Sequence, residues 1–160
     1  MDSSVETRFA CDAMLGGLAR WLRAAGYDTS WQEGIHDHDL IRLSRHEGRT
    51  LLSSDMGIFR FAVIRDNMQP ALFVPLQVSP IQQLRHVLEK LHLQLNDPRC
   101  MACGGELVEV PKELVENRVP PRTRLAGEFL GMCPLPARLL ARDALAEYHG
   151  SVTACNCRGK

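Results

Sequence analysis

The first part of the chain alternates short apolar runs with segments whose apolar residues recur every three or four positions. The first run, Phe9–Cys11, predicts a buried strand that ends at Asp12. The next segment has one apolar face, which is made by Leu15, Leu18, Ala19, Leu22 and Ala25. This spacing predicts a helix, and Gly26 is the residue type that ends a helix in the left-handed conformation. The chain therefore opens as a strand, an acidic residue and a helix.

The same alternation continues to about residue 96. We expect further strands over 27–35, 49–55 and 71–76 and helices over 40–48 and 80–91. Ser79 and Pro80 are typical of a helix start, with the serine as cap and the proline as first residue. Strands that alternate with helices of this length favour a parallel sheet with helices on its faces.

Acidic residues recur at the places where this pattern changes. Asp12 and Asp55 end predicted strands, and Asp37 or Asp39 opens the helix between them. If the strands are parallel, these acids reach the same edge of the sheet, where α/β proteins bind their ligands. Three carboxylates there would suit Mg²⁺ or Mn²⁺, which can activate water for attack on a phosphodiester. The alternative interpretation is a set of separate helix caps and surface acids.

Length and charge restrict the classes of protein that fit. The 160 residues allow one core, or a domain of about 100 residues with a small appendage. The formal net charge is zero, so a nucleic-acid partner would have to be bound by a local patch. The N-terminus is polar, and no apolar run approaches the roughly 20 residues that cross a bilayer. We expect a cytoplasmic protein that does not enter a membrane.

Five of the six cysteines lie at or after position 100, a distribution that indicates metal binding in a reducing compartment. Cys100 and Cys103 form a CxxC motif with two glycines directly behind it, as in a zinc knuckle. A thioredoxin-type redox pair is the rival interpretation. That motif belongs at a helix start after a strand, whereas here a hairpin-like run, ELVEV, follows.

Three stretches together resemble the Mut7-C family: FACDAMLGGLARWLRAAGYDT, DLIRLSRHEGRTLLSSD and RCMACGGELVEV. These are PIN-like ribonuclease domains with a C-terminal zinc ribbon, and the match covers roughly residues 8–129. The resemblance implies an α/β, three-layer PIN-like domain with a parallel sheet, followed by a small zinc ribbon. It also implies cleavage of RNA with a divalent metal, and by position it assigns the family's acids to Asp12, Asp39 and Asp55, with Asp37 as a neighbouring metal ligand.

Ser53-Ser54-Asp55 stands where the family has a T-R-D-like segment. Ser53 keeps a hydroxyl that could cap a helix or bind the water of the metal, and it is one candidate for RNA binding. Ser54 removes an arginine that could contact phosphate. The other candidates for the RNA backbone are basic residues near the acids, where solvated helix faces are the alternative for at least two of them: Arg20, Arg23, Arg45 and Arg49.

The tail departs from the family pattern. Cys133 is the third expected zinc ligand, but Pro136 occupies the place of the fourth, and Cys155 and Cys157 could substitute only by a detour. We hypothesise a frameshift after Leu135, because a neighbouring reading frame can encode the family's ending. An amphipathic helix over 137–148 is the alternative. The expected divisions are a nuclease domain over 6–96, a zinc-ribbon segment, incomplete as it stands, over 97–136 and a divergent tail over 137–160.

The function that these residues and the resemblance together imply is a metal-dependent endoribonuclease that uses Mg²⁺ or Mn²⁺, with water as nucleophile and a structural Zn²⁺ in the ribbon. A non-catalytic RNA- or ribosome-associated binding module on the same scaffold is the second hypothesis. A thiol redox protein built on Cys100 and Cys103 is the third. The oligomeric state does not follow from the sequence.

Overall fold

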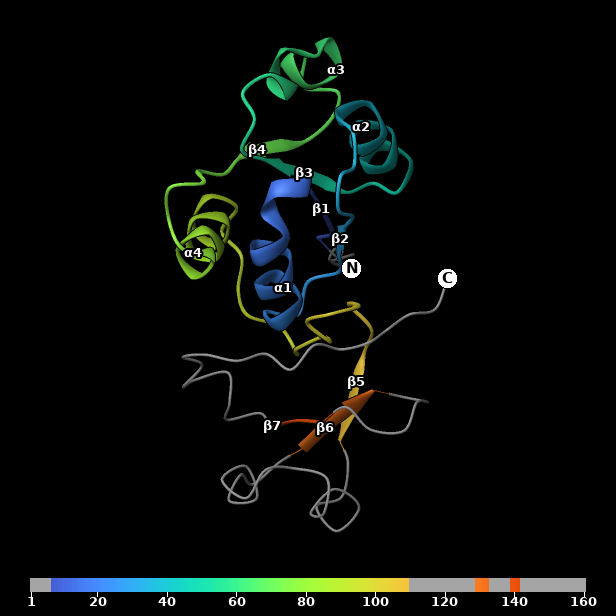
Figure 1. Ribbon diagram of the computed structural model, residues 1–160, viewed down its shortest axis with the longest axis vertical. Coiled ribbons are helices and arrows are strands. Elements are labelled where there is room, and N and C mark those ends of the chain that lie inside the picture. Colours follow the sequence, from blue (N-terminus) through green and yellow to red (C-terminus); the bar gives the residue numbers. More distant parts are fainter. Residues whose placement is uncertain (1–6, 110–128, 133–138, 142–160) are drawn as a thin grey trace, which may run out of the picture.

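The computed structural model describes residues 7–109, 129–132 and 139–141 of the chain (Figure 1). Four parallel strands form the central sheet in the order β2-β1-β3-β4. Their bounds are Phe9–Cys11 for β1, Thr29–Trp31 for β2, Thr50–Ser53 for β3 and Ala71–Phe73 for β4. The predicted parallel sheet is therefore confirmed.

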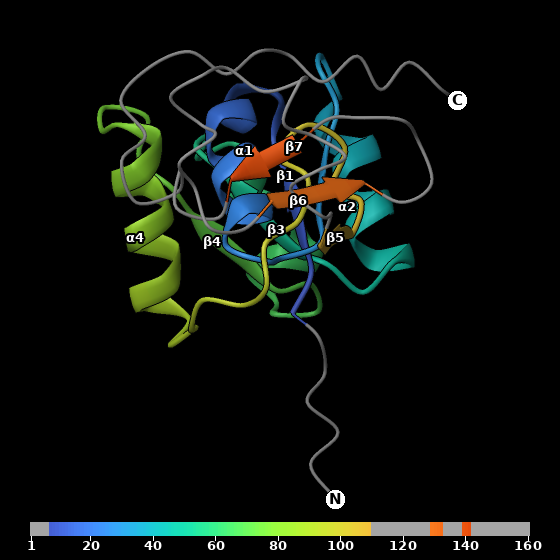
Figure 2. The ribbon, with the colours of Figure 1, turned by 90° about the horizontal axis from the view of Figure 1, so that it is seen from below.

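Helices cover both faces of this sheet. They are the 3-10 turn η1 (Ala13–Leu15), α1 (Gly16–Ala24), α2 (Asp37–His46), the 3-10 turn η2 (Ile58–Arg60), α3 (Ala62–Arg65) and α4 (Pro80–Lys90). In Figures 1 and 2, α1 and α4 lie together on one face and α2 lies on the other. The described part has the α/β, three-layer arrangement expected of a PIN-like domain.

Alternate strand residues supply two cores. Cys11 and Leu52 pack with α1 and α4, whereas Ala10 and Leu51 pack with α2 and η2. Successive side chains of a strand point to opposite faces, so residues two positions further along β1 and β3 return to the α2 side. Asp12 and Ser53 are those residues. The strand pattern thus sets the face on which the first acid lies.

Two local predictions about helix ends are confirmed. Ser79 caps α4 in a capping box, in which its hydroxyl accepts from the Gln82 N–H and the Gln82 side chain accepts from the Ser79 N–H. Gly26 follows the end of α1 with a φ of +91°, and a Cβ there would lie 2.5 Å from the Cβ of Asn96. A larger residue would therefore meet both backbone strain and a clash.

Several strands are shorter than predicted. The strand expected over 71–76 ends at Phe73, because β4 is an edge strand and Pro75 has no N–H with which to continue the ladder. The strand expected over 27–35 covers only Thr29–Trp31. Among the described residues, no helix has both the length and the apolar character needed to cross a bilayer.

A second, antiparallel sheet lies in the C-terminal part, in the order β5-β6-β7. Its strands are Leu107–Glu109, Phe129–Met132 and Leu139–Ala141. The alternative helix over 137–148 is therefore wrong at 139–141, where the backbone bonds to β6 in a sheet. The rest of that predicted segment lies outside the described residues.

Candidate active site

The centre of the parallel sheet contains a topological switch point. The chain leaves β1 through α1 on one face to reach β2, and leaves β2 through α2 on the other face to reach β3. At their carboxyl ends, the neighbouring strands β1 and β3 thus continue to opposite faces of the sheet, β1 into α1 and β3 into η2 and α3 on the α2 side. Ligands of open α/β sheets bind in the crevice between two such strands. Asp12 follows β1 directly, and Asp55 lies two residues after β3. The sheet brings these two predicted acids to the same place.

Ser53 joins the two acids. Its hydroxyl donates to Oδ2 of Asp12 at 2.7 Å and accepts from the backbone N–H of Asp55 at 3.0 Å. Asp12 is only 7% exposed and Ser53 is fully buried. A buried carboxylate needs such a donor, because burial removes its water ligands. Ser53 therefore positions the acids and does not face RNA, which corrects its place among the RNA-binding candidates.

Asp55 is exposed, in contrast to Asp12. Its Oδ1 accepts from the N–H of Gly57 at 2.7 Å, which closes a tight turn before η2. A Cβ on Gly57 would lie 3.0 Å from that same oxygen, so the turn favours glycine. The carboxylate is thus fixed at the edge of the sheet while remaining accessible from solution.

The third predicted acid is at the start of α2, where the sequence left Asp37 and Asp39 open. Asp37 shares a helix face with Leu40, Ile41 and Ser44, all buried against the sheet, and is itself half-buried. Because α2 follows β2, its first turn lies at the carboxyl edge of the strands. Of the two acids in this turn, Asp37 is thus the one on the helix face that packs toward the sheet.

Asp39 lies on another face of α2. It is exposed and forms an ion pair with Arg42 at 2.6 Å. It also lines a hollow of about 540 Å³, whose other residues are Gln32, Gly34, Ile35, His36, Arg42, Leu43 and His46. Neither Asp12 nor Asp55 lines this hollow. The assignment of Asp39 as the third catalytic acid stays a prediction, but Asp39 lies on a different face of α2 from Asp37, since two residues along a helix turn a side chain by roughly 200°.

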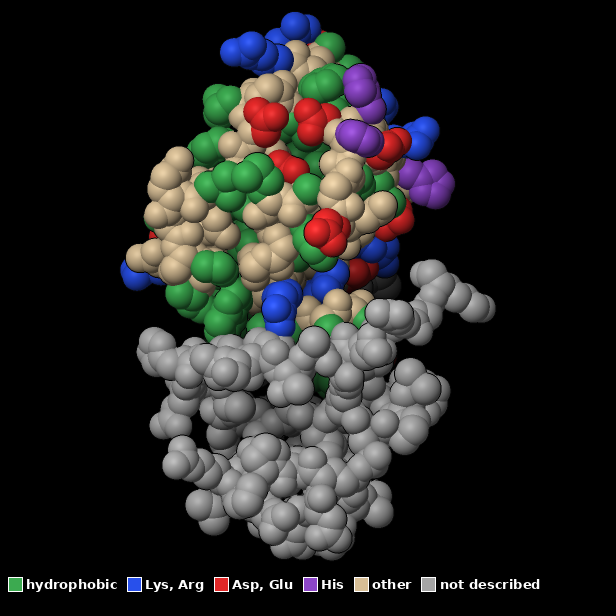
Figure 3. Space-filling view, in the orientation of Figure 1, with side chains coloured by type: hydrophobic (Ala, Val, Ile, Leu, Met, Phe, Trp, Pro, Cys, Tyr) green, Lys and Arg blue, Asp and Glu red, His purple; other side chains and the backbone are tan. Residues whose placement is uncertain are grey.

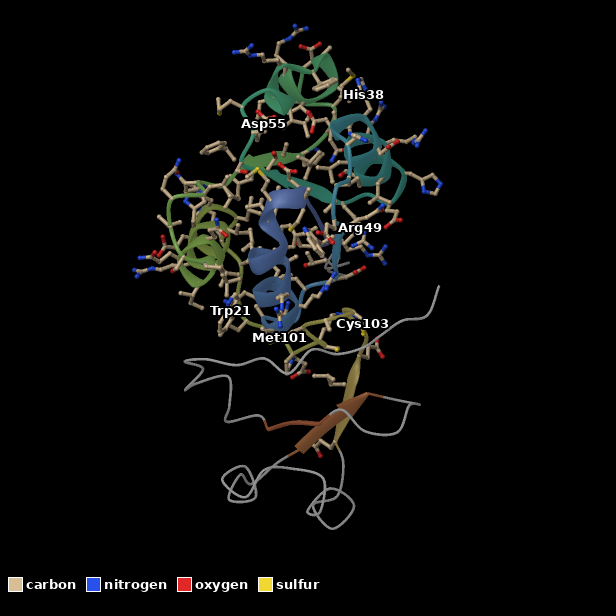
Figure 4. The ribbon with its side chains drawn as sticks, in the orientation of Figure 1. Trp21, His38, Arg49, Asp55, Met101 and Cys103 are labelled. Atoms are coloured by element: carbon tan, nitrogen blue, oxygen red, sulfur yellow. The ribbon has the colours of Figure 1, made fainter. Side chains whose placement is uncertain are left out.

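Acidic side chains gather over the ends of the strands in Figure 3, and Figure 4 shows Asp55 there. Within the described residues, however, no three His, Cys, Asp or Glu side chains stand close enough to form a metal-binding group. The buried Oγ of Ser54, the residue between Ser53 and Asp55, has no hydrogen-bond partner. The edge thus holds the carboxylates of Asp12 and Asp55, of which the first is joined through Ser53 to the backbone N–H of Asp55, and the first turn of α2.

Arg23 lies at the opposite edge of the sheet. Its buried guanidinium donates to the carbonyls of Thr29 at 3.0 Å, Met101 at 3.2 Å and Ala102 at 2.6 Å. Burial lowers the pKa of this guanidinium, and the nearby Cys11, Cys103 and Cys100 act in the other direction. Arg23 has a structural role, so its assignment as an RNA-binding candidate is corrected.

Arg49 is also used within the fold. It precedes β3, and its guanidinium donates to Asp28 at 3.0 Å, to Glu47 and to the carbonyl of Phe9 at 3.2 Å. Burial acts to lower the pKa of Arg49, but the bonds to Asp28 and Glu47 outweigh it and raise the pKa. Arg49 is likewise removed from the RNA-binding candidates. Arg20, half-exposed on α1, and Arg45, exposed on α2, stay predictions.

The CxxC motif forms a tight turn on a hairpin. The Gly104 N–H donates to the carbonyl of Cys100 at 2.7 Å, and the Cys100 N–H donates to Gly105 at 2.8 Å. Gly104 has a φ of +76°. This is the backbone form expected of a zinc knuckle and not of a helix start. Figure 4 shows Cys103 and Met101 beside the end of α1, far from Asp55.

The remaining predicted zinc ligand, Cys133, lies outside the described residues, as do Pro136, Cys155 and Cys157. The described part therefore presents two thiols, Cys100 buried and Cys103 exposed, in a spacing that fits one half of a tetrahedral zinc site.

Comparisons with known proteins bear on this geometry. The family model described as the Mut7-C RNAse domain matches residues 7–139. The human protein named exonuclease mut-7 homolog is 28% identical over 116 residues. That alignment covers 69% of this chain but only 13% of the human protein's length. No solved structure matches the chain.

Proposed function

The chain belongs to the Mut7-C RNAse domain family, and from this premise we propose that it is a metal-dependent endoribonuclease. Its site is the carboxyl edge of β1 and β3, with Asp12, Asp37 and Asp55 as the acids. One observation carries the proposal above the others: Ser53 ties Asp12 to Asp55 at the switch point of the sheet. The family suggests a nuclease, and these two acids lie at the edge of the sheet where α/β folds bind their ligands.

The donor set at this edge fits a hard divalent cation. Carboxylate oxygens are the ligands that Mg²⁺ and Mn²⁺ prefer, and such ions keep several waters. When bound, the ion would stabilise charge on the phosphodiester and lower the pKa of a bound water. Asp12, Asp37 and Asp55 would hold the ion.

Each acid has its own way of being held. The hydroxyl of Ser53 fixes the orientation of the Asp12 carboxylate, so that its other oxygen can face the edge of the sheet. Asp37 occupies the first turn of α2, where the helix dipole favours a negative charge. Asp55 is exposed and accessible to the attacking water. Arg20, one turn into α1, is the proposed contact to the RNA backbone.

We also propose that Cys100 and Cys103 bind a structural Zn²⁺ together with Cys133. Two thiolates two residues apart and glycines directly behind them support this proposal. The hairpin that presents the thiols lies at the end of the domain opposite to the acids, so the zinc would act on the fold and on RNA held there rather than on the reaction.

A non-catalytic RNA-binding module is the second candidate, and one observation favours it. Asp12 and Asp55 each accept a hydrogen bond from the protein, so both could serve the fold alone. The two candidates differ in whether exchanging a carboxylate for an amide abolishes a reaction or only weakens binding.

The test is cleavage of a circular single-stranded RNA with Mg²⁺, with Mn²⁺ and with EDTA. A circle has no ends, so only an endonuclease can open it. We expect cleavage with either metal and none with EDTA. Asp12→Asn, Asp37→Asn and Asp55→Asn should each lower the cleavage rate by at least about a hundredfold, because each removes a charge that holds the ion.

Asp39→Asn is the matched control, because it removes the same charge from the same helical turn. We expect it to cleave at close to the wild-type rate. Loss of activity in Asp39→Asn with full activity in Asp37→Asn would reverse the assignment of the third acid. A folded wild-type protein that binds RNA but opens no circle with either metal would support the binding module instead.

A further inference from the structure

Three large apolar side chains are exposed next to the proposed acids. Met14 is 66% exposed, Met56 is 60% exposed and Phe73 is 37% exposed. Most large apolar residues of the central domain are buried in its two cores. Figure 3 shows hydrophobic side chains directly beside the acidic ones on this face. We refer to Met14, Met56 and Phe73 as the apolar rim.

Each member of the rim is carried by a strand end of the site. Met14 lies two residues after Asp12, in the turn where the Leu15 N–H donates to the Asp12 carbonyl at 2.9 Å. Met56 follows Asp55 within the turn closed by Gly57. The geometry of the acids therefore also determines where the two methionines lie.

Phe73 is the last residue of β4, and its Cα is paired with that of Ser53 in the parallel ladder. The pairing places Phe73 on the same face of the sheet as Ser53 and Asp12. The Phe59 ring meets the Phe73 ring edge-on, with centroids 6.2 Å apart and an interplanar angle of 62°. This contact supports one edge of the Phe73 ring while part of the ring stays open to solvent.

The strands that carry the rim, β1, β3 and β4, are neighbours in the sheet. At a spacing of about 4.8 Å between strands, the rim extends over roughly 10 Å along the edge. A flexible methionine on each of two turns and one supported aromatic ring make a surface that can adapt to planar groups. The ligand that best fits such a surface is a nucleobase of an RNA whose phosphate lies at the acids.

The charges of the domain favour the same occupant. The formal net charge is zero. Arg23 and Arg49 are used within the fold, and Arg42 is paired with Asp39. Fewer arginines therefore remain for phosphate contacts than the sequence offers, which leaves room for a second source of affinity besides the phosphate contacts that dominate in strongly basic proteins. Stacking of bases on aromatic and apolar side chains is the other large source of affinity for single strands.

We propose that the apolar rim is the nucleobase-binding surface of this site, and that it selects RNA with unpaired bases at the cleaved linkage. Bases inside a duplex are stacked and paired and cannot be placed on a protein ring without being opened. The proposal rests on the nuclease function proposed above, since that function places a phosphodiester at the acids.

The experiment measures binding in EDTA, so that no cleavage occurs. Fluorescence anisotropy compares a labelled single-stranded RNA oligomer with an oligomer of the same length that has abasic ribose at every position. We expect the wild-type protein to bind the base-bearing oligomer more tightly. Phe73→Leu keeps an apolar side chain but removes the ring, and should weaken this binding on the order of tenfold. Its affinity for the abasic oligomer should not change.

Three further variants separate stacking from a change of fold. Phe73→Tyr keeps the aromatic face and should bind the base-bearing oligomer like the wild type. Met56→Gln, at a highly exposed position, should weaken binding severalfold without loss of stability. Met68→Gln is the matched control, because Met68 is 62% exposed but lies just before β4, at the opposite edge of the sheet. It should bind like the wild type.

The outcomes for the rim and for the nuclease are distinct. The proposal that the rim binds nucleobases would be overturned if the wild type bound both oligomers with equal affinity. It would also be overturned if Phe73→Leu and Met68→Gln lost the same affinity for the base-bearing oligomer. Either result would stand even if circular RNA is cleaved. A base-dependent affinity that falls in Phe73→Leu would support the rim even if no circle is opened. Preference for duplex RNA over the single strand would also overturn it.

Discussion

At the scale of the residue, one hydroxyl supports the proposed site. The Oγ of Ser53 donates a hydrogen bond to the nearly buried carboxylate of Asp12 and accepts one from the backbone N–H of Asp55. A charged acceptor loses more than a neutral one when its buried donor is removed, because water cannot replace the lost bond fully. Position 53 therefore affects both stability and the geometry of Asp12.

We predict that Ser53→Ala lowers the free energy of unfolding by about 1–3 kcal/mol, as expected for an unsatisfied buried carboxylate. Cleavage should fall with it, because Asp12 would no longer be held. Urea denaturation followed by circular dichroism gives the stability. Ser53→Thr keeps the hydroxyl and serves as the control. An alanine variant as stable and active as the threonine variant would contradict this role.

Cys11 is a second residue whose environment decides its chemistry. Its thiol is fully buried, and burial raises its pKa from 9.0 to about 12, with Arg23 lowering it and Asp12 raising it as smaller effects. An unfolded chain exposes this thiol to water, where it loses its proton near the ordinary value. Between the two pKa values the folded state binds more protons than the unfolded state.

We therefore predict that the free energy of unfolding falls as the pH rises from about 9 toward 12, by at most about 1.4 kcal/mol per pH unit from this thiol. Below pH 9 the contribution is fully present. The measurement is urea denaturation of the wild type and Cys11→Ala across this range. The difference between the two should be constant below pH 8 and shrink above pH 9. A constant difference throughout would rule out the thiol as the cause.

At the scale of the element, helix α1 anchors the hairpin that presents the CxxC motif. The carbonyl of Arg23 accepts from the Arg99 N–H at 2.9 Å, while its guanidinium binds the carbonyls of Met101 and Ala102. A Cβ at Gly104 would lie 3.4 Å from Nε of Arg23, so the turn packs closely on this side chain. The hairpin is therefore part of the packing of the central domain.

We predict that Arg23→Met lowers the free energy of unfolding by about 2–4 kcal/mol, because three carbonyls lose a charged donor in a buried place. Arg20→Met, on the same helix at a half-exposed position, should change it by no more than about 0.5 kcal/mol. Thermal and urea denaturation of both variants check the difference. Equal stabilities would show that the guanidinium contributes no more than a surface arginine.

At the scale of the whole molecule, the proposed site and the CxxC hairpin lie at opposite ends of the central domain. The nine residues of α1 between them span about 13 Å. Completing the zinc ribbon should therefore affect stability and leave the metal dependence of cleavage unchanged. Cys133 and Pro136 lie outside the described residues, so the sequence alone supports this expectation.

We predict that Pro136→Cys, which restores a second CxxC with Cys133, increases the zinc affinity and raises the melting temperature. Pro136→Ser is the control, because it removes the proline without adding a ligand. Zinc content by atomic absorption and a competition titration with a chelator give the affinity. Equal zinc binding in both variants would place the fourth ligand elsewhere.

The frameshift hypothesis has its own test in the coding DNA, which must contain a site where two added bases restore a cysteine at position 136.

The sequence alone determined the order of strands and helices, the cap of α4, the glycine turn after α1 and the two acids that follow β1 and β3. These features depend on interactions between residues close in the chain, such as side-chain periodicity, capping and turn conformation. The resemblance to the Mut7-C family also came from short stretches of this kind, and the family match confirmed it.

The tertiary structure alone decided which of these residues face one another. Asp37 and Asp39 are nearly equivalent in sequence, and only the packing of Leu40 and Ile41 against the sheet separates them. Arg23 binds carbonyls 78 and 79 residues away, and Ser53 binds a carboxylate 41 residues away. The sequence does not show whether a given arginine or serine is solvated or buried. Its role is decided by the partners that the fold brings to it, because burial makes every polar group depend on them.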